Sequence, residues 1–216
     1  MVTDAAQRGE RRRMRTRAML IDAAEELLAN GPFASVRIED IADGADMSVG
    51  AVYVHFENKD GVIAAVGERI ATRAVEQLSA AFEPGASPYE QFSSAGPAYM
   101  RFLLDNPAFV RYLATEPAGH ESQVLQESAS RTISALLTLF EAAIQACVDA
   151  GQIRPVDARL MAHFLFGAWN GVAGLVLGPS GATLTAADVE QCLEQARHIV
   201  LAGLASTPAR TEGIPR

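Results

Sequence analysis

Cysteine is scarce in this sequence: Cys147 and Cys192 are the only two among 216 residues, far apart and without a metal or redox motif beside them. This pattern excludes a dense disulfide framework and is typical of small buried side chains in a reducing compartment. The four histidines are also scattered, and none lies near a cysteine or carboxylate at a zinc-binding spacing. We therefore expect no metal site.

Motifs of enzymes are missing as well. The chain has no glycine-rich loop of the kind that cradles phosphate groups, and it has no nucleophile elbow. We therefore expect no catalytic residues, no cofactor and no enzymatic activity. Turnover of a substrate by the purified protein would reopen the enzyme alternative.

Long apolar runs are also absent. None follows the basic N-terminus, so we see no signal peptide and expect a cytoplasmic protein. The most apolar stretch, FLFGAWNGVAGLVLG from Phe164, contains Asn170 and is shorter than the roughly 20 residues that a membrane-spanning helix requires. We expect no membrane span.

Charge is unevenly distributed along the chain. Residues 1–20 hold six arginines against Asp4 and Glu10, a balance of +4, so a net charge of −8 leaves −12 for the rest. The arginines are Arg8, Arg11, Arg12, Arg13, Arg15 and Arg17. A basic segment on an acidic protein indicates either a localised anionic partner or a solvated, disordered tail.

Helical periodicity is present almost throughout, and strands are not indicated. Turn-rich breaks such as EPGASP and GPSGATLT separate the helical segments. The expected helices span residues 12–30, 38–45, 49–56, 59–82, 89–104, 107–115, 122–150, 155–177 and 186–205. The predicted fold class is all-α, with a small N-terminal unit followed by a larger helical bundle.

Two short predicted helices joined by a three-residue break have the arrangement of a helix-turn-helix. At about 100° per residue, Val52 and Phe56 fall on the inner side of the second helix. Its outer side carries Gly50, Ala51 and Val54, and such small side chains let a helix approach DNA in the major groove. A helical subdomain with no partner remains the alternative.

Polar groups border this small-residue face. Tyr53 and His55 lie at its edges, where a hydroxyl or ring N–H reaches phosphate oxygens. Lys59 opens the next helix, where a positive charge and unpaired backbone N–H groups attract an anion. Ser48 either caps the short helix or contacts a phosphate.

The segment IEDIADGADMSVGAVYVHFENKDGVI resembles the DNA-binding region of TetR-type transcriptional regulators. The matching positions are Ile38, Ile41, Ala42, Ser48, Gly50, Tyr53, His55, Phe56 and Lys59. The resemblance implies that Tyr53, His55 and Lys59 grip the DNA backbone. It also implies that base edges meet the helix face formed by Val49, Gly50, Ala51 and Val54.

Two positions depart from the family pattern. Asp46 stands where the family often has glycine, and aspartate tolerates a left-handed turn better than most residues. Val36 and Arg37 stand where the family usually has a capping hydroxyl, for which Ser35 is the available substitute. Because the reading face has few hydrogen-bond donors, we expect Arg37 and the arginine-rich segment to contribute to DNA recognition.

We divide the chain into five parts on these grounds. They are a flexible basic arm at 1–14, a helix-turn-helix domain at 15–60, a connecting helix at 61–83, an effector-binding and dimerisation domain at 84–206, and a disordered tail at 207–216.

The helix predicted at 155–177 is apolar on almost every side, so we expect both of its faces to be buried. One face would pack on its own subunit and the other on a second copy, with helix 186–205 completing a homodimer. The resemblance agrees, because TetR-type regulators dimerise through their last two long helices. A two-fold dimer also places two reading helices one DNA turn apart, as a palindromic operator requires.

Aromatic side chains are common after residue 84 and either pack the core or line a small-molecule pocket. The resemblance implies an effector pocket, and hence a repressor that a small, largely apolar molecule releases from its operator. We expect the effector to contact Tyr99, Tyr112, Phe140, Phe164, Trp169 and Asn170. The alternative is an all-α interaction protein that has lost DNA binding.

Overall fold

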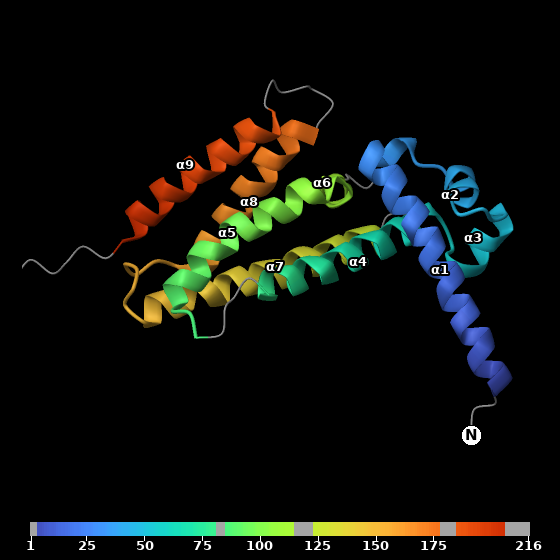
Figure 1. Cartoon of the computed structure of the whole chain (residues 1–216), viewed down its shortest axis with the longest axis horizontal. Helices are drawn as coiled ribbons and strands as arrows, with labels where there is room; N and C mark the ends of the chain where they lie inside the picture. The colour runs from blue at the N-terminus through green and yellow to red at the C-terminus, as the bar shows by residue number, and fades with distance from the viewer. Residues whose placement is uncertain (1–3, 81–84, 115–122, 178–184, 206–216) are drawn as a thin grey trace, which may run out of the picture.

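The computed structural model describes residues 4–80, 85–114, 123–177 and 185–205. Its helices, shown in Figure 1, are α1 (Asp4–Asn30), the short 3₁₀ helix η1 (Phe33–Ser35), α2 (Ile38–Gly44), α3 (Val49–His55), α4 (Lys59–Ala80), α5 (Pro88–Asp105), α6 (Pro107–Leu113), α7 (Gln123–Asp149), α8 (Ala158–Leu177) and α9 (Ala186–Leu204). The all-α fold class is confirmed. Within the described ranges the β contact is an isolated bridge between Ile153 and Ala205.

Local sequence signals set many of these helix ends. α1 ends at Asn30, because Pro32, two residues further on, lacks the N–H group that would continue the helix. At the start of α9, Thr185 and Asp188 form the capping box that their spacing predicts. Apart from the start of α1, the predicted helix ends lie within three residues of the observed ones.

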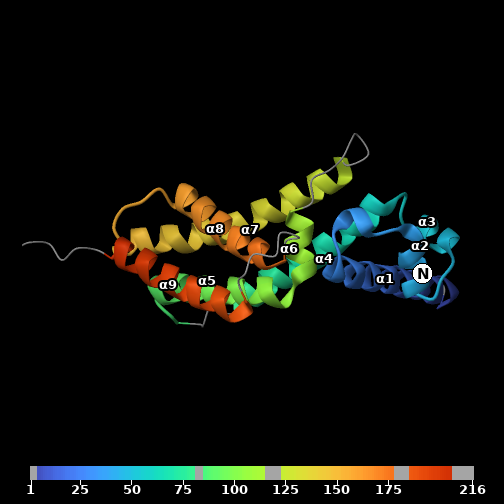
Figure 2. The same ribbon diagram turned by 90° about the horizontal axis from the view of Figure 1, so that it is seen from above.

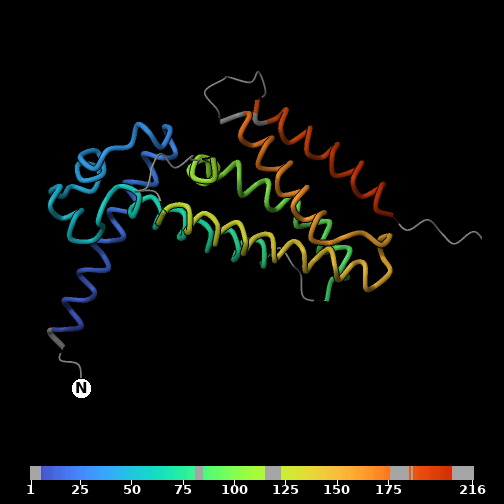
Figure 3. The backbone as a smooth tube through the Cα atoms, turned by 180° about the vertical axis from the view of Figure 1, so that it is seen from behind, coloured from blue at the N-terminus to red at the C-terminus, as the bar shows by residue number. Residues whose placement is uncertain are grey.

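The helices form two units, which we call the head (α1–α3) and the body (α4–α9). α4 starts against the head and runs into the body, where it lies alongside α7 (Figures 1 and 3). Figure 2 shows the head at one end of the elongated molecule and α9 on the outer side of the body. The predicted tail at 207–216 lies outside the described residues.

Each unit has a buried core. Leu20, Ile41 and Val52 are completely buried between the three helices of the head. The body is built around aromatic rings, with Phe102 and Phe109 in edge-to-face contact at a centroid separation of 5.5 Å. The core of the body thus adds packed aromatic rings to its aliphatic side chains.

The N-terminal segment differs from our expectation. We expected a flexible arm at residues 1–14, but α1 begins at Asp4 and continues without a break to Asn30. Alanine, glutamine, arginine, glutamate and methionine dominate this segment and all favour helix. The basic segment is therefore the first part of a long helix, and Figure 1 shows it projecting from the head.

Candidate nucleic-acid interface and effector cavity

Helix α3 presents the outward face that its periodicity predicts. Val52 is completely buried, and Phe56, just beyond the last turn, is 7% exposed. Tyr53 and Val54 are 56% and 70% exposed. The helix is thus fastened to the head by one side and leaves the other side uncovered.

The start of α3 is also arranged as the sequence indicates. The Ser48 hydroxyl accepts a hydrogen bond from the Ala51 N–H at 3.2 Å and so caps the helix. Asp46 occupies the left-handed region with φ of 55°, as expected for the turn before α3. Gly50 is exposed, and Val49 and Ala51 are half-buried beside it. A flat, weakly polar surface results.

Tyr53 and Lys59, two of the residues predicted to contact the DNA backbone, differ in what surrounds their side chains. Tyr53 extends from α3 into solvent. The Lys59 ammonium donates to the Phe33 carbonyl at 3.3 Å and lies 4.1 Å from the centroid of that ring. An ammonium has three N–H groups, so two of them stay available for an anion.

The third grip, His55, lies close to positive charge. Burial first, and then the guanidinium groups of Arg13 and Arg17, lower the pKa of His55 below its usual 6.5. Its Nδ1 atom is buried and has no hydrogen-bond partner. The imidazole is therefore neutral at pH 7 and lies beside two cations from α1.

Arg37 is engaged at the start of α2. Its Nε and Nη2 atoms donate to the two carboxylate oxygens of Asp40 at 3.2 and 3.3 Å, and this pairing raises the pKa of Arg37. The hydroxyl of Ser35 donates to the Pro32 carbonyl, so it does not cap α2 as we had considered. A DNA contact by Arg37 requires its side chain, which is 69% exposed, to leave Asp40.

A cavity of about 340 Å³ lies in the body between α5, α8 and α9. Its walls are mostly apolar and include Met100 from α5, Trp169 and Val172 from α8, and Leu193 and Val200 from α9. Both its size and its lining are typical of a site for a small apolar molecule.

Two of the six predicted effector residues, Phe164 and Trp169, line this cavity. Tyr99 and Phe140 instead pack in the buried core, with ring centroids 5.3 Å apart, and burial raises the pKa of the Tyr99 hydroxyl. Asn170 donates from Nδ2 to the Tyr99 hydroxyl at 3.1 Å. These positions favour the core-packing interpretation for Tyr99, Phe140 and Asn170.

Tyr112 lies apart from the cavity. Its ring packs so closely on α4 that a Cβ added to Gly67 would overlap it. Its hydroxyl donates to the Ser128 hydroxyl at 2.9 Å. This residue therefore holds α4, α6 and α7 together and also borders a shallower groove between α7 and α8.

Charged side chains lie where the cavity opens. Arg101 and Glu190 are exposed, and Arg197 is bound through two hydrogen bonds to Glu194, at 2.6 and 2.9 Å. The Arg197 guanidinium lowers the pKa of Glu194. Sequence reasoning missed the role of α9 here, since its apolar stripe also fits a dimer interface.

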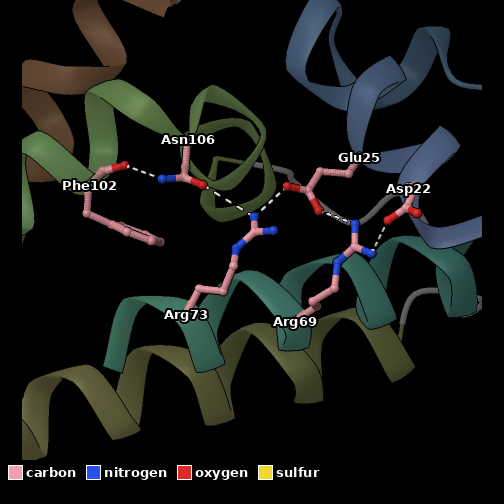
Figure 4. A network of polar contacts seen from close by, with 6 residues as sticks. All are labelled: Asp22, Glu25, Arg69, Arg73, Phe102 and Asn106. Carbon is pink, nitrogen blue, oxygen red and sulfur yellow. Dashed lines mark hydrogen bonds and ion pairs between the residues drawn. The ribbon is translucent and has the colours of Figure 1, made fainter. Parts of the chain in front are cut away.

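A chain of ion pairs connects the head to the body, as Figure 4 shows. Arg69 of α4 donates to Asp22 and Glu25 of α1, while Arg73, one turn further on, donates to Glu25 and to the side-chain oxygen of Asn106. Asn106 joins α5 to α6 and donates to the backbone of α5 at 2.8 Å. The junction of two body helices is thus linked through α4 to the head.

The outward side of α8 carries exposed apolar side chains in the single chain, and this is the face that we expected a second copy of the protein to bury. Leu160 and Phe164 are 56% and 62% exposed on α8, and Ile199 is 73% exposed on α9. A Cβ added to Gly167 or Gly171 of α8 would meet nothing within 4 Å. This surface is apolar and permits close approach by another helix.

Two further features concern metals and membranes. Among the described residues, no group of three or more histidines, cysteines and carboxylates is placed to hold a metal ion. In the same part of the chain, α7 is the one helix long and apolar enough to span a membrane. α7 packs against α4, α5 and α8, and such length and composition alone are weak evidence of a membrane span.

Comparison with protein families gives two matches. Residues 20–66 match the bacterial regulatory proteins of the tetR family, and residues 90–201 match the tetracyclin repressor-like C-terminal domain. A search of curated proteins finds no match.

Solved structures with the same fold include known regulators. The fatty acid degradation regulator FadR from Bacillus halodurans has 18% sequence identity and a TM-score of 0.72, covering 87% of this chain and 98% of that one. FadR from Bacillus subtilis, solved in complex with stearoyl-CoA, has 16% identity, a TM-score of 0.72 and the same coverage of both chains. A protein from Rhodococcus sp. assigned to the TetR family has 21% identity, a TM-score of 0.73, and coverage of 87% and 99%.

Proposed function

Because the chain belongs to the tetR family of bacterial regulatory proteins, we propose that it is a repressor that leaves a palindromic operator when a small, largely apolar molecule binds the body. Members of this family bind DNA through the N-terminal domain. A DNA operator as partner places the protein in the cytoplasm. We expect it to act by binding alone, without catalysis.

The observation that carries the DNA-binding role is the uncovered face of α3. Gly50, Tyr53 and Val54 are exposed, whereas Val52 on the opposite side is completely buried. Exposing a valine and a tyrosine to water does not stabilise the fold of the head. A helix that enters the major groove, in contrast, needs uncovered side chains to contact the bases. The apolar part of this face suits the methyl groups of thymine.

A homodimer is supported by the uncovered side of α8 and α9. A leucine and a phenylalanine of α8 and an isoleucine of α9 are exposed, and the glycines of α8 leave room for a second helix. Two-fold pairing through this side buries the same surface of both subunits. It also gives the two α3 helices the symmetry of a palindrome.

The cavity between α5, α8 and α9 supports an effector site. It is closed on one side by α9, which belongs to the proposed dimer surface, and on another by α5, whose C-terminal end is connected to the head through Asn106 and Arg73. An effector that fits the cavity better in one arrangement of these helices would shift the population of that arrangement. FadR from Bacillus subtilis binds stearoyl-CoA, so long-chain acyl compounds are the first to try.

The DNA-binding role is tested by selection from a random-sequence duplex pool with the full-length protein. We expect enrichment of a palindrome with half-sites about 10 base pairs apart, or a multiple of one turn. Absence of any enriched sequence would contradict a sequence-specific regulator.

The effector role is tested on the selected duplex with stearoyl-CoA and with any molecule found by native mass spectrometry of the purified protein. Release of DNA should disappear in Val200→Trp, which fills the cavity, and persist in Val200→Leu, which adds one methylene. Equal release by both variants would place the effector elsewhere.

A further inference from the structure

The arginines of the N-terminal helix fall on two opposite sides of α1. Arg13 and Arg17 are one turn apart and continue the stripe that is formed deeper in the head by Leu20, Ala24 and Leu28, all completely buried. At about 100° per residue, Arg11 and Arg15 lie roughly 160° away from this stripe. The helix therefore separates two pairs of arginines that have identical spacing and charge.

The first pair lies directly over the end of α3. The Arg17 guanidinium carbon is 4.9 Å from the centroid of the Phe56 ring, and Arg13 and Arg17 both act electrostatically on His55. Both arginine side chains are exposed, so the positive charge there faces solvent. Phe56 holds one guanidinium in place by its ring face, as cation–π contacts do.

The surroundings of His55 point to a missing negative charge. Its Nδ1 atom is buried and lacks a partner, and the two charged groups that act on its ring, Arg13 and Arg17, are both positive. Neither Arg13 nor Arg17 forms an ion pair in the described part of the chain. Three nitrogen-bearing side chains from two helices thus converge without an acidic partner.

We propose that Arg13, Arg17 and His55 form one phosphate-binding site for the DNA strand beside α3, and that Arg11 and Arg15 take no part in it. This site rests on the proposed DNA-binding function and assigns a position to part of the basic segment. A phosphate placed there contacts two guanidinium groups and the imidazole at the C-terminal end of the reading helix. The site also fixes α1 as a rigid arm along the DNA backbone.

A matched pair of double variants in the full-length protein tests the site. Arg13→Gln with Arg17→Gln, and Arg11→Gln with Arg15→Gln, remove the same charge from the same helix. Binding to the duplex selected by the wild-type protein is measured at several salt concentrations. Each lost phosphate contact lowers the slope of log affinity against log salt by about 0.9, so the first variant, which empties one phosphate site, should lose about 0.9 per subunit and the second should match wild type.

Two results overturn the assignment, and a third result overturns the function on which it rests. Equal loss of slope in both variants would mean that the arginines act only through total charge, and no loss in the first would leave the site without a ligand. Failure of the wild-type protein to bind any duplex would instead refute the proposed function. Because Arg17 packs on Phe56, a thermal melt accompanies each variant, and Arg17→Lys, which keeps the charge and the ring contact, should retain most of the slope.

Discussion

Most aromatic side chains of the body are buried in its core, whereas the head leaves Tyr53 exposed on α3. In the body, Phe102, Phe109 and Tyr99 are almost completely buried and pack against one another. In the head, Tyr53 is exposed on α3 although the helix has a well-packed inner side. The buried rings contribute to the stability of the body, whereas the exposed ring of Tyr53 lies on the face that we propose to bind DNA.

Removing one aromatic ring from each unit tests whether the buried and the exposed ring differ in their contribution to stability. Phe109→Ala should lower the free energy of unfolding by about 3–5 kcal/mol, because the ring is completely buried. Tyr53→Ala should leave it within about 0.5 kcal/mol of wild type, as exposed substitutions do. Chemical denaturation measures both, and similar losses would mean that Tyr53 is structural.

Val54→Glu tests the exposed face of α3, and here we expect a loss of DNA affinity without a loss of stability. A carboxylate on this face repels phosphates, so DNA affinity should fall by about a hundredfold, or ~2.7 kcal/mol, while the melting temperature stays the same. Val124→Glu is the control, since Val124 is 50% exposed on α7 of the body. Fluorescence anisotropy with the selected duplex measures both affinities. An equal loss of affinity in the control would mean that the added net charge, and not its position on α3, causes the loss.

The outward side of α8 is tested with Leu160→Glu, again compared with Val124→Glu. Burial of a leucine is worth about 1.5–3 kcal/mol, so a charge at this position should weaken dimerisation at least tenfold. Sedimentation at several concentrations should show monomers for Leu160→Glu and dimers for the control. A dimer of unchanged strength would place the interface on another surface.

The link between the units should have a smaller effect. Glu25→Gln removes the carboxylate that binds both Arg69 and Arg73, and we expect a loss of about 1 kcal/mol in the free energy of unfolding. Because Glu25 is only 20% exposed, part of this loss should persist at high salt. The same variant should weaken the release of DNA by the effector. An unchanged release would mean that the ion pairs of Glu25 do not transmit effector binding from the body to the head.

The smallest expected effect is a pH dependence within the head. The pKa of His55 is lowered on folding, so below about pH 6.5 the unfolded chain binds a proton that the folded head does not. Stability from this source is complete above pH 6.5 and is lost as the pH falls through the lower folded pKa. Between about pH 7 and pH 5, wild type should therefore lose slightly more stability than His55→Gln, and parallel curves would contradict the shift.

Sequence reasoning succeeded in the head because its signals are local. Neighbours within one or two helical turns determine three features that the sequence predicts. These are the capping of α3 by Ser48, the left-handed conformation of Asp46 and the burial of Val52. The pairing of Arg37 with Asp40 has a local signal too, because an acid three residues after an arginine lies on the same side of a helix.

The body was predictable as helices but not as a site. Periodicity identifies the inward side of a helix, yet it cannot separate tight packing, as at Tyr99, from a cavity wall, as at Trp169. The Glu25–Arg73 pair joins residues 48 positions apart, and no sequence spacing indicates it. The composition of residues 4–14 does favour a helix, because most of these residues have high helix propensity. The expectation of a flexible arm rested on the positive charge of the segment alone.

Hydrogen–deuterium exchange with and without the selected duplex is the most direct test of the head as the DNA-binding unit. We predict slower exchange in α3, Val49–His55, and in the part of α1 that carries Arg13 and Arg17, with α7 unchanged. Protection confined to the body, or none at all in α3 under saturating duplex, would contradict the account.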